Sequence, residues 1–197
     1  MIVLSSFKKN IVMKKNFISN SSESVRMFKS NFLESLSKVS FYIPLIVYIP
    51  VILYLGWFSL FRIQMDILSF FGYILFGLFV WSLTEYILHR FVFHFYPKGE
   101  LLKRIHFIFH GVHHDYPNDA KRLVMPPSAS IPLAVGFYFL FDYLLPTGTN
   151  QAFFIGFIGG YLIYDMMHYA LHHANFKSGI WKRLKQHHML HHYSDST

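Results

Sequence analysis

Histidine is the residue type in this chain whose spacing points most directly to chemistry. All 13 histidines lie between His89 and His192, six of them by His114 and the other seven from His168 onward. A neutral imidazole offers a nitrogen lone pair to a transition metal. Two banks of histidines, each following a long apolar run, therefore indicate a metal site near the ends of membrane spans.

The spacing of the histidines supports this interpretation. Two triplets have the spacing i, i+3, i+4, namely His110, His113 and His114, and His188, His191 and His192. On a helix each triplet lies on one face, so its imidazoles can converge on one point. His168 and His172 are one helical turn apart and also share a face. His89 and His94 are five apart, which splays them by about 140° on a straight α-helix, so we expect the helix to end or bend between them.

The pairs and triplets together give ten candidate metal ligands. These are His89, His94, His110, His113, His114, His168, His172, His188, His191 and His192. A tetrahedral zinc takes four ligands, so ten indicate two metal ions with about five nitrogens each, and imidazole suits iron or zinc better than calcium or magnesium. The alternative for one histidine at a helix end is snorkelling to the interface. So many unpartnered imidazoles near a bilayer would cost about 1–3 kcal/mol each.

Six further residues are expected to support the ligands. They are His106, His173 and His187, which fall outside the repeated pattern, and Glu85, Asp115 and Asp165, each one to four positions from a ligand histidine. Each carboxylate is expected to accept the outer N–H of a ligand imidazole and fix its tautomer. A solvated interfacial charge is the alternative, most of all for Asp115. The three histidines are expected to orient ligands, contact substrate or pack.

Composition indicates a small membrane protein with one domain. Of the 197 residues, 53% are hydrophobic, 20% aromatic and 14% charged. The chain has no cysteine, which excludes disulfides, thiolate metal sites and thiol catalysis. The net charge of +8 does not indicate a nucleic-acid partner, because the cations border apolar runs.

Four apolar runs predict membrane spans at about residues 41–60, 67–88, 131–145 and 152–171. Twenty residues at 1.5 Å each cross a hydrocarbon layer of about 30 Å. The third run contains Asp142 and the fourth Asp165, so a tight hairpin dipping through the bilayer is an alternative for these two. Lys and Arg number seven before the first span, one in the first loop, six in the second, none in the third and four in the tail. By the positive-inside rule both termini and both histidine banks are cytoplasmic.

Residues 1–40 are predicted to form a cytosolic basic segment with one short helix. Asn31 and Glu34 have the spacing of a capping box at its start. Apolar residues Phe32, Leu33, Leu36 and Val39 would lie on one side, so we expect the helix to rest on the membrane surface. Residues 41–197 are predicted to form the membrane-embedded domain.

The motifs resemble one branch of a known superfamily. They are HRFVFH at 89–94, HGVHH at 110–114, RLVMPP at 122–127, HYALHH at 168–173 and HHMLHHY at 187–193. Together with the lead-in from about residue 25, they resemble the fatty acid 2-hydroxylase branch of the membrane fatty acid hydroxylases. RLVMPP favours this branch over sterol and carotenoid oxygenases, which share similar histidine clusters.

The resemblance implies an all-α integral membrane protein with about four transmembrane helices and a cytosolic helical cap that holds a dimetal centre. It implies the ten ligands above, iron in the active enzyme with zinc possible in the isolated protein, and O2 as oxidant. The reaction it implies is hydroxylation at C2 of a long acyl chain, free or amide-linked in a sphingolipid. Many relatives carry a fused cytochrome b5 domain that this sequence lacks, so electrons are expected from a separate protein such as cytochrome b5 or a ferredoxin.

Two alternatives and one departure accompany the resemblance. Another dimetal lipid oxygenase or desaturase, acting on a sterol, carotenoid or alkyl chain, has similar histidine clusters. A metal transporter without redox chemistry would need polar residues along all the spans, and the first span offers only Ser59 and tyrosines. Relatives usually continue beyond the last histidine cluster, whereas this sequence stops at Thr197, so we expect a shortened member or a truncated product.

Overall fold

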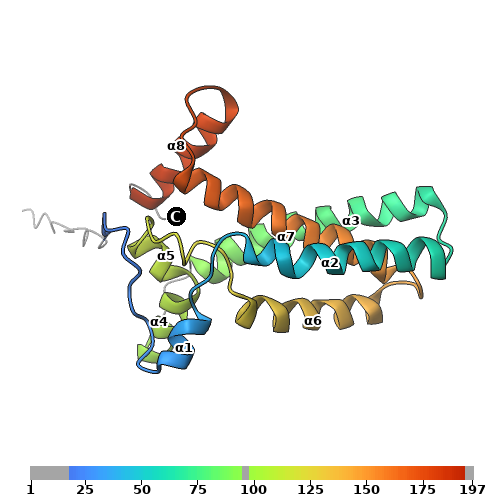
Figure 1. The fold of residues 1–197 in the computed structure, drawn as a ribbon, viewed down its shortest axis with the longest axis horizontal. Helices are drawn as coiled ribbons and strands as arrows, with labels where there is room; N and C mark the ends of the chain where they lie inside the picture. Colours follow the sequence, from blue (N-terminus) through green and yellow to red (C-terminus); the bar gives the residue numbers. More distant parts are fainter. Residues whose placement is uncertain (1–17, 95–97, 194–197) are drawn as a thin grey trace, which may run out of the picture.

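Four long helices run side by side, and the short helices gather at one end of them (Figure 1). The computed structural model describes residues 18–94 and 98–193, so the first 17 residues of the expected basic segment lie outside it. The long helices are α2 (Ile43–Trp57), α3 (Ile67–Ile87), α6 (Pro127–Leu144) and α7 (Asn150–His173). The helices at the end of the bundle are the short α1 (Asn31–Leu36), α4 (Glu100–His106) and α5 (Val112–Asp115), together with α8 (Gly179–Tyr193). The described residues contain no strand, which confirms the predicted all-α class.

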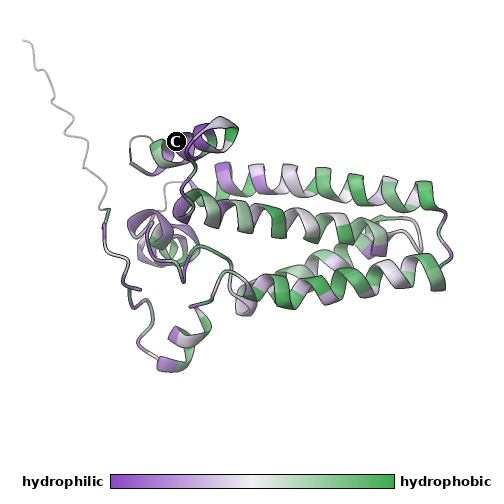
Figure 2. Ribbon diagram, turned by 45° about the horizontal axis from the view of Figure 1, so that its top comes forward, coloured by the Kyte–Doolittle hydropathy of each residue, from purple (hydrophilic) through white to green (hydrophobic). Residues whose placement is uncertain are grey.

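Two of the described helices are long and apolar enough to cross a membrane. Ile43–Arg62 joins α2 to the π-helix η1 (Phe58–Arg62), and Ile67–Phe93 joins α3 to the π-helix η2 (Leu88–Phe93); their mean hydropathies are 2.0 and 1.9. Large apolar side chains on them face outward, among them Leu53 at 67% exposure and Phe79 at 64%. Figure 2 shows that apolar residues extend along most of the length of the long helices. Together with the fold neighbour described below, these helices indicate a membrane protein.

Helix α7 forms the centre of the bundle and packs against α2, α3, α6 and α8. Its buried side chains include Phe153, Phe157 and Tyr161, which join the core with residues from the other long helices. The same helix also buries Asn150 and Asp165. A helix surrounded by protein can carry such polar groups, which explains why α7 is less apolar than α2 or α3.

Glycines bring α3 and α7 into unusually close contact. A Cβ atom on Gly77 would lie 1.9 Å from the carbonyl oxygen of Phe153, and one on Gly156 would lie 1.9 Å from that of Ile74. Only a hydrogen atom fits at either place, as in other membrane helix pairs joined through small residues. This contact fixes the ends of α3 and α7 relative to each other.

The start of α1 differs from the predicted capping box. Ser30 occupies the N-cap position without a side-chain cap, and Asn31 is already helical. The Glu34 carboxylate instead accepts hydrogen bonds from the backbone N–H groups of Met27 and Phe28, at 2.9 and 3.0 Å. It also pairs with buried Arg122 at 2.7 Å. Glu34 therefore ties the segment before α1 to the loop that precedes α6, which the local pattern did not reveal.

Candidate metal centre

The ends of the helices bring the histidines of the two banks together in two sets. The first set is His113 from α5, His168 and His172 from α7, and His188 and His192 from α8. The second set is His89 from η2, His94 just after it, His110 from the π-helix η3 (Phe107–Gly111), and His191 from α8. Within each set the ligand atoms all lie within 4.8 Å of one another. Helix α8 thus contributes to both sets.

A π-helix brings His89 and His94 together. Helix α3 widens after Ile87 into η2, whose backbone hydrogen bonds join residues i and i+5, and η2 ends at Phe93, directly before His94. The helix therefore ends between His89 and His94, as the five-residue spacing predicted. Their Nε2 atoms are 3.2 Å apart.

Each histidine triplet divides between the two sets, contrary to the expectation that it converges on one point. His110 belongs to the second set and His113 to the first, with their ring centroids 5.9 Å apart. His114 lies between the sets: its Nε2 is 2.9 Å from that of His110, and its ring stacks on His192 at 4.3 Å. A triplet on one helical face therefore spans both sets.

The donor atoms fit two metal ions. Seven Nε2···Nε2 pairs among the ten histidines lie at 2.7–3.4 Å. Metal–nitrogen bonds of about 2.1 Å put adjacent donors about 3.0 Å apart at right angles and about 3.4 Å apart at tetrahedral angles. His89 Nε2 lies close to both His94 and His191. One ring nitrogen cannot satisfy two such neighbours with a single proton, whereas a shared metal can.

The surroundings keep the imidazoles in the neutral form that binds metals. Burial, followed by the imidazoles of His192 and His191, lowers the pKa of His114 to about 2. Burial and the neighbouring His191 lower the pKa of His188 to about 4. The outward Nδ1 atoms of His113 and His192 are buried without a hydrogen-bond partner among the described residues. These rings therefore offer Nε2 to the centre.

The six supporting residues lie at different distances from the ligands. Glu85 Oε1 is 4.0 Å from His89 Nδ1, beyond hydrogen-bond length. Asp165 accepts the backbone N–H of Met125 at 3.2 Å, and no hydrogen bond links it to His168 among the described residues. Burial raises the pKa of the Asp115 carboxyl, although the nearby imidazole of His106 opposes this.

The three histidines outside the pattern do not enter either set. His106 donates from Nε2 to the carbonyl of Phe93 at 2.6 Å, next to His94. His173 packs its ring on Tyr169 at 4.7 Å, and His187 is exposed. Of these three, His106 is the one that holds a ligand-bearing segment in place.

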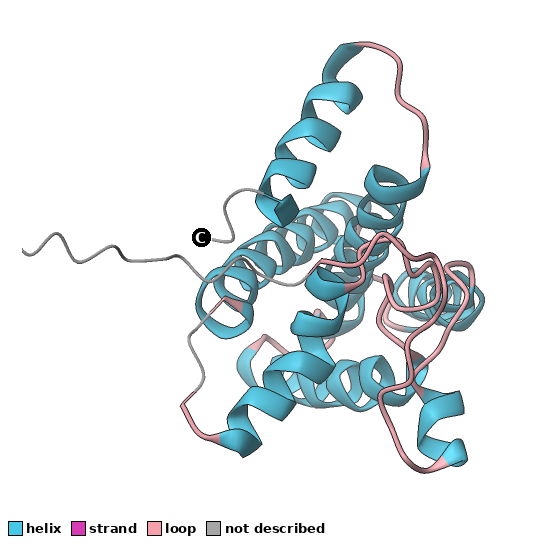
Figure 3. Ribbon diagram, turned by 90° about the vertical axis from the view of Figure 1, so that its left-hand side faces the viewer, coloured by secondary structure: helices cyan, strands magenta, loops and turns pink. Residues whose placement is uncertain are grey.

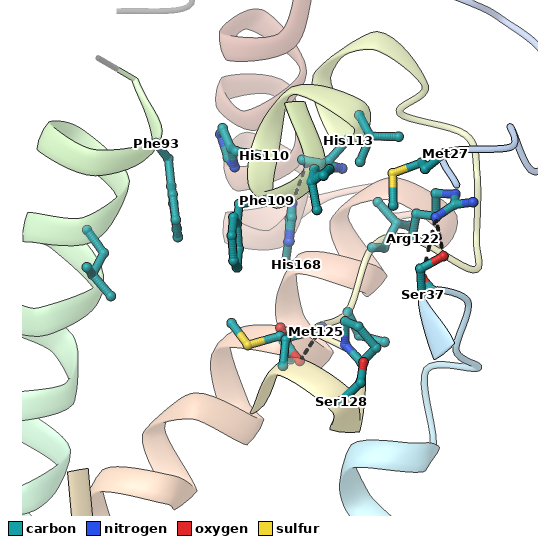
Figure 4. Close-up of a pocket in the computed structure, with 18 of the residues that line it drawn as sticks. Met27, Ser37, Phe93, Phe109, His110, His113, Arg122, Met125, Ser128 and His168 are labelled. Atoms are coloured by element: carbon teal, nitrogen blue, oxygen red, sulfur yellow. Dashed lines mark hydrogen bonds between the residues drawn. The ribbon is translucent and has the colours of Figure 1, made fainter. Parts of the chain in front are cut away.

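A cavity of about 330 Å³ reaches the histidines from α1 (Figure 4). Its lining includes His110, His113 and His168 of the histidine sets and Leu33 and Leu36 of α1. Most of its wall is apolar, and its polar lining side chains, apart from the histidines, include Ser37, Glu85, Arg122, Ser128, Tyr164 and Asp165. The mostly apolar lining suits a hydrocarbon chain.

Sequence reasoning missed two residues that bear on the site. Tyr164 lines the cavity. Its position one helical turn before His168 was the only feature of the sequence that could have indicated this. Lys185 on α8 donates to the carbonyls of His172 and Ala174, at 3.1 and 2.8 Å. It thereby satisfies the C-terminal end of α7 and joins the two helices that carry most of the first set.

The fold and the site indicate a helical membrane protein with two adjacent histidine sets that could each hold a metal ion. The sequence profile of the fatty acid hydroxylase family matches residues 74–197. The chain therefore belongs to the fatty acid hydroxylase family, as the motifs indicated.

Characterised relatives extend the match over most of the chain. Human fatty acid 2-hydroxylase is 37% identical, over 86% of this chain and 51% of its own length. The dihydroceramide fatty acyl 2-hydroxylase FAH2 of Arabidopsis thaliana is 36% identical, over 87% of this chain and 72% of its own length. A solved structure described as full-length scs7p, with only the hydroxylase domain visible, superposes with a TM-score of 0.78 at 38% identity, covering 84% of this chain and 63% of that one. This chain thus spans about half the length of the human relative.

Proposed function

We propose that this protein hydroxylates C2 of a long acyl chain, either a free fatty acid or the N-acyl chain of a sphingolipid, with O2 as oxidant. The observation that carries the proposal is the pair of facing imidazole sets that contribute to the wall of a mostly apolar cavity. The names of the human and Arabidopsis relatives support the reaction and the two substrate types.

All ten predicted ligands would hold the metal pair, with iron expected in the active protein and zinc possible in its place. The bound pair would supply the redox chemistry, in which one oxygen atom of O2 replaces a C2 hydrogen with hydroxyl while the other leaves as water, using two electrons and two protons. The electrons would come from a separate donor such as cytochrome b5 or a ferredoxin.

The protein's own side chains would set the position of the reaction. The apolar walls of the cavity would hold the hydrocarbon and exclude water. The Tyr164 hydroxyl would donate a hydrogen bond to the carboxyl or amide oxygen at C1, and the carboxylates of Glu85 and Asp165 would accept one from an amide N–H. C2 is bonded to C1, so it would then be the carbon held nearest the histidines.

For the topology, we propose four spans, formed by α2, α3, α6 and α7, with the termini and the metal centre on the cytoplasmic side. The distribution of Lys and Arg supports this orientation. The short helices and loops around the centre would form the cap, within one domain from residue 41 onward. Exposed Phe32 (70%), Leu33 (47%) and Leu36 (42%) support a surface position for α1.

Mass spectrometry of hydrolysed lipids tests the reaction. The full chain would be expressed in a host that makes sphingolipids but no 2-hydroxy acyl chains, beside His113→Ala and the matched variant His187→Ala. We expect a 2-hydroxy acyl species with the wild type and with His187→Ala, since His187 is exposed and outside both sets. We expect none with His113→Ala.

The outcomes separate the parts of the proposal. A hydroxyl at another carbon, or a double bond, would point to a different lipid oxygenase. Product that persists in His113→Ala would sink the dimetal mechanism. Metal analysis of the purified wild type, with two metals per chain expected, distinguishes a missing electron donor from a centre that never assembles.

A further inference from the structure

The first half of α8 carries apolar side chains that no other part of the described chain covers. Ile180 is 68% exposed, Trp181 48% and Leu184 39%. Ile180, Leu184, His188 and His191 follow one another in steps of four, four and three, so they form one stripe along the helix. The exposed apolar residues therefore lie on the face that presents ligands to the metal centre.

Helix α8 runs across the end of the bundle, so its first turns extend beyond the long helices. Figure 1 shows α8 crossing the histidine-bearing end of the bundle. Figure 3 looks along the bundle from that end, and the start of α8 stands clear of the long helices behind it. The histidines of α8 reach the ends of α3 and α7. One and two turns earlier, the same face projects past the bundle, to where lipid would surround the spans.

The charges around the stripe suit an anionic lipid surface. Residues 174–193 contain four cationic side chains and no acidic one. Lys177, Lys182 and Arg183 are exposed, whereas Lys185 is engaged with the end of α7. Trp181 stacks on Phe176 at 5.9 Å. Tryptophan beside lysine and arginine is the composition of a membrane–water interface.

We propose that residues 180–184 of α8 lie in the headgroup region of the bilayer that α2 and α3 cross, with a preference for anionic phospholipid. This inference rests on the proposed topology. A water-soluble acidic partner is a weaker fit, because it would approach from the aqueous side, away from this stripe. Since His188, His191 and His192 belong to the same helix, its contact with lipid also fixes the side of the metal centre that α8 supplies.

Nitroxide accessibility in proteoliposomes tests the proposal, and the absence of native cysteine makes single labels straightforward. Ile180→Cys and Leu184→Cys probe the stripe, and Lys182→Cys and Gln186→Cys probe the opposite face. Leu53→Cys on α2 reports on the span itself. Collisions with O2, which concentrates in lipid, are compared with collisions with a water-soluble nickel chelate, in phosphatidylcholine with and without phosphatidylserine.

We expect the O2-to-nickel ratio at positions 180 and 184 to be several-fold higher than at 182 and 186, and to rise further with phosphatidylserine. Nickel access at all four positions, with Leu53→Cys still in lipid, would overturn the inference and leave the topology intact. Nickel access at Leu53→Cys would overturn the topology instead. Protection of positions 180 and 184 from both reagents would mean that protein covers the stripe, and this outcome would also overturn the inference.

Discussion

The two histidine sets are built on different kinds of backbone. The first set draws its ligands from regular α-helices, and three of them, His113, His168 and His172, come from α5 and the core helix α7. The second set draws His89 and His110 from the π-helices η2 and η3. His113 and His192 of the first set are buried, whereas His110 is the buried member of the second.

This difference indicates that the two sets differ in how rigidly the backbone positions their ligands. An α-helix anchored in a packed core holds its side chains in a narrow range of positions. A π-helix has poorer packing and is rare, and its occurrence near functional sites reflects the side-chain positions that only its wider turn allows. We therefore expect the first set to hold its metal more tightly and the second to tolerate change in its ligands.

Removing one ligand from each set gives the largest effect and tests that difference directly. In His168→Ala we expect the metal of the first set to be lost, together with hydroxylation and a large part of the thermal stability, because that metal joins α5, α7 and α8. In His94→Ala we expect hydroxylation to fall by more than about 100-fold, while the first metal stays. Metal analysis and thermal unfolding in detergent measure the two outcomes; equal loss of metal and of stability in both variants would show that the sets are equivalent.

The histidine clusters could be predicted from the sequence because metal ligation needs particular residue types at particular spacings. Spacings of three and four predicted helices that display His110, His113 and His114 together. The spacing does not say that His110 and His113 belong to different sets, because a turn of about 60° between them matters only once both partners are in place. That partition depends on α8, which is distant in sequence.

Contacts between helices far apart in the sequence could not be predicted in the same way. Gly77 and Gly156 are ordinary residues of apolar runs until α3 and α7 cross at these two positions. The pairing of Glu34 with Arg122 depends likewise on a fold that brings residues 88 positions apart together. The local pattern predicted that Glu34 would cap its own helix, whereas its carboxylate pairs with Arg122 instead.

Adding a methyl group where glycines bring α3 and α7 together is expected to give the next largest effect, on thermal stability and metal binding. Gly156→Ala would force α3 and α7 apart, because the new Cβ would lie 1.9 Å from the carbonyl of Ile74. Overpacking of this kind costs about 1–3 kcal/mol, and we expect a lower Tm together with weaker metal binding at both sets. Gly159→Ala is the matched control, since no atom lies within 4 Å of the added Cβ. A Tm unchanged in Gly156→Ala would mean that the helices are not in close contact in the membrane.

Chelation tests whether the more exposed set releases its metal first. With increasing concentrations of a water-soluble chelator, we expect one metal to be lost first, which leaves a form with one metal per chain. The affinity of the protein for the metal lost first would be about tenfold weaker than for the other, a difference of about 1.4 kcal/mol. His94→Ala should lack the weak phase and His168→Ala the strong one. Loss of both metals in a single step would remove the distinction between the sets.

The segment before α1 contributes no histidine to either set, and we expect the smallest effect there, measured as thermal stability. Burial acts to raise the pKa of the Glu34 carboxyl, but hydrogen bonds from Lys38 and from the backbone of Phe28 and Met27, with the charge of Arg122, lower it to about 2. Because the folded pKa lies below the ordinary value of 4.5, this stabilisation is complete above about pH 4.5 and is lost as the pH falls toward 2. We expect the Tm of the wild type to exceed that of Glu34→Gln by a few degrees at about pH 6 and the gap to narrow below pH 4.5, with the metal content of both proteins equal at about pH 6. Glu23→Gln, at an exposed position, is the control. A gap that does not depend on pH would mean that the shape of the side chain, and not its charge, holds this segment.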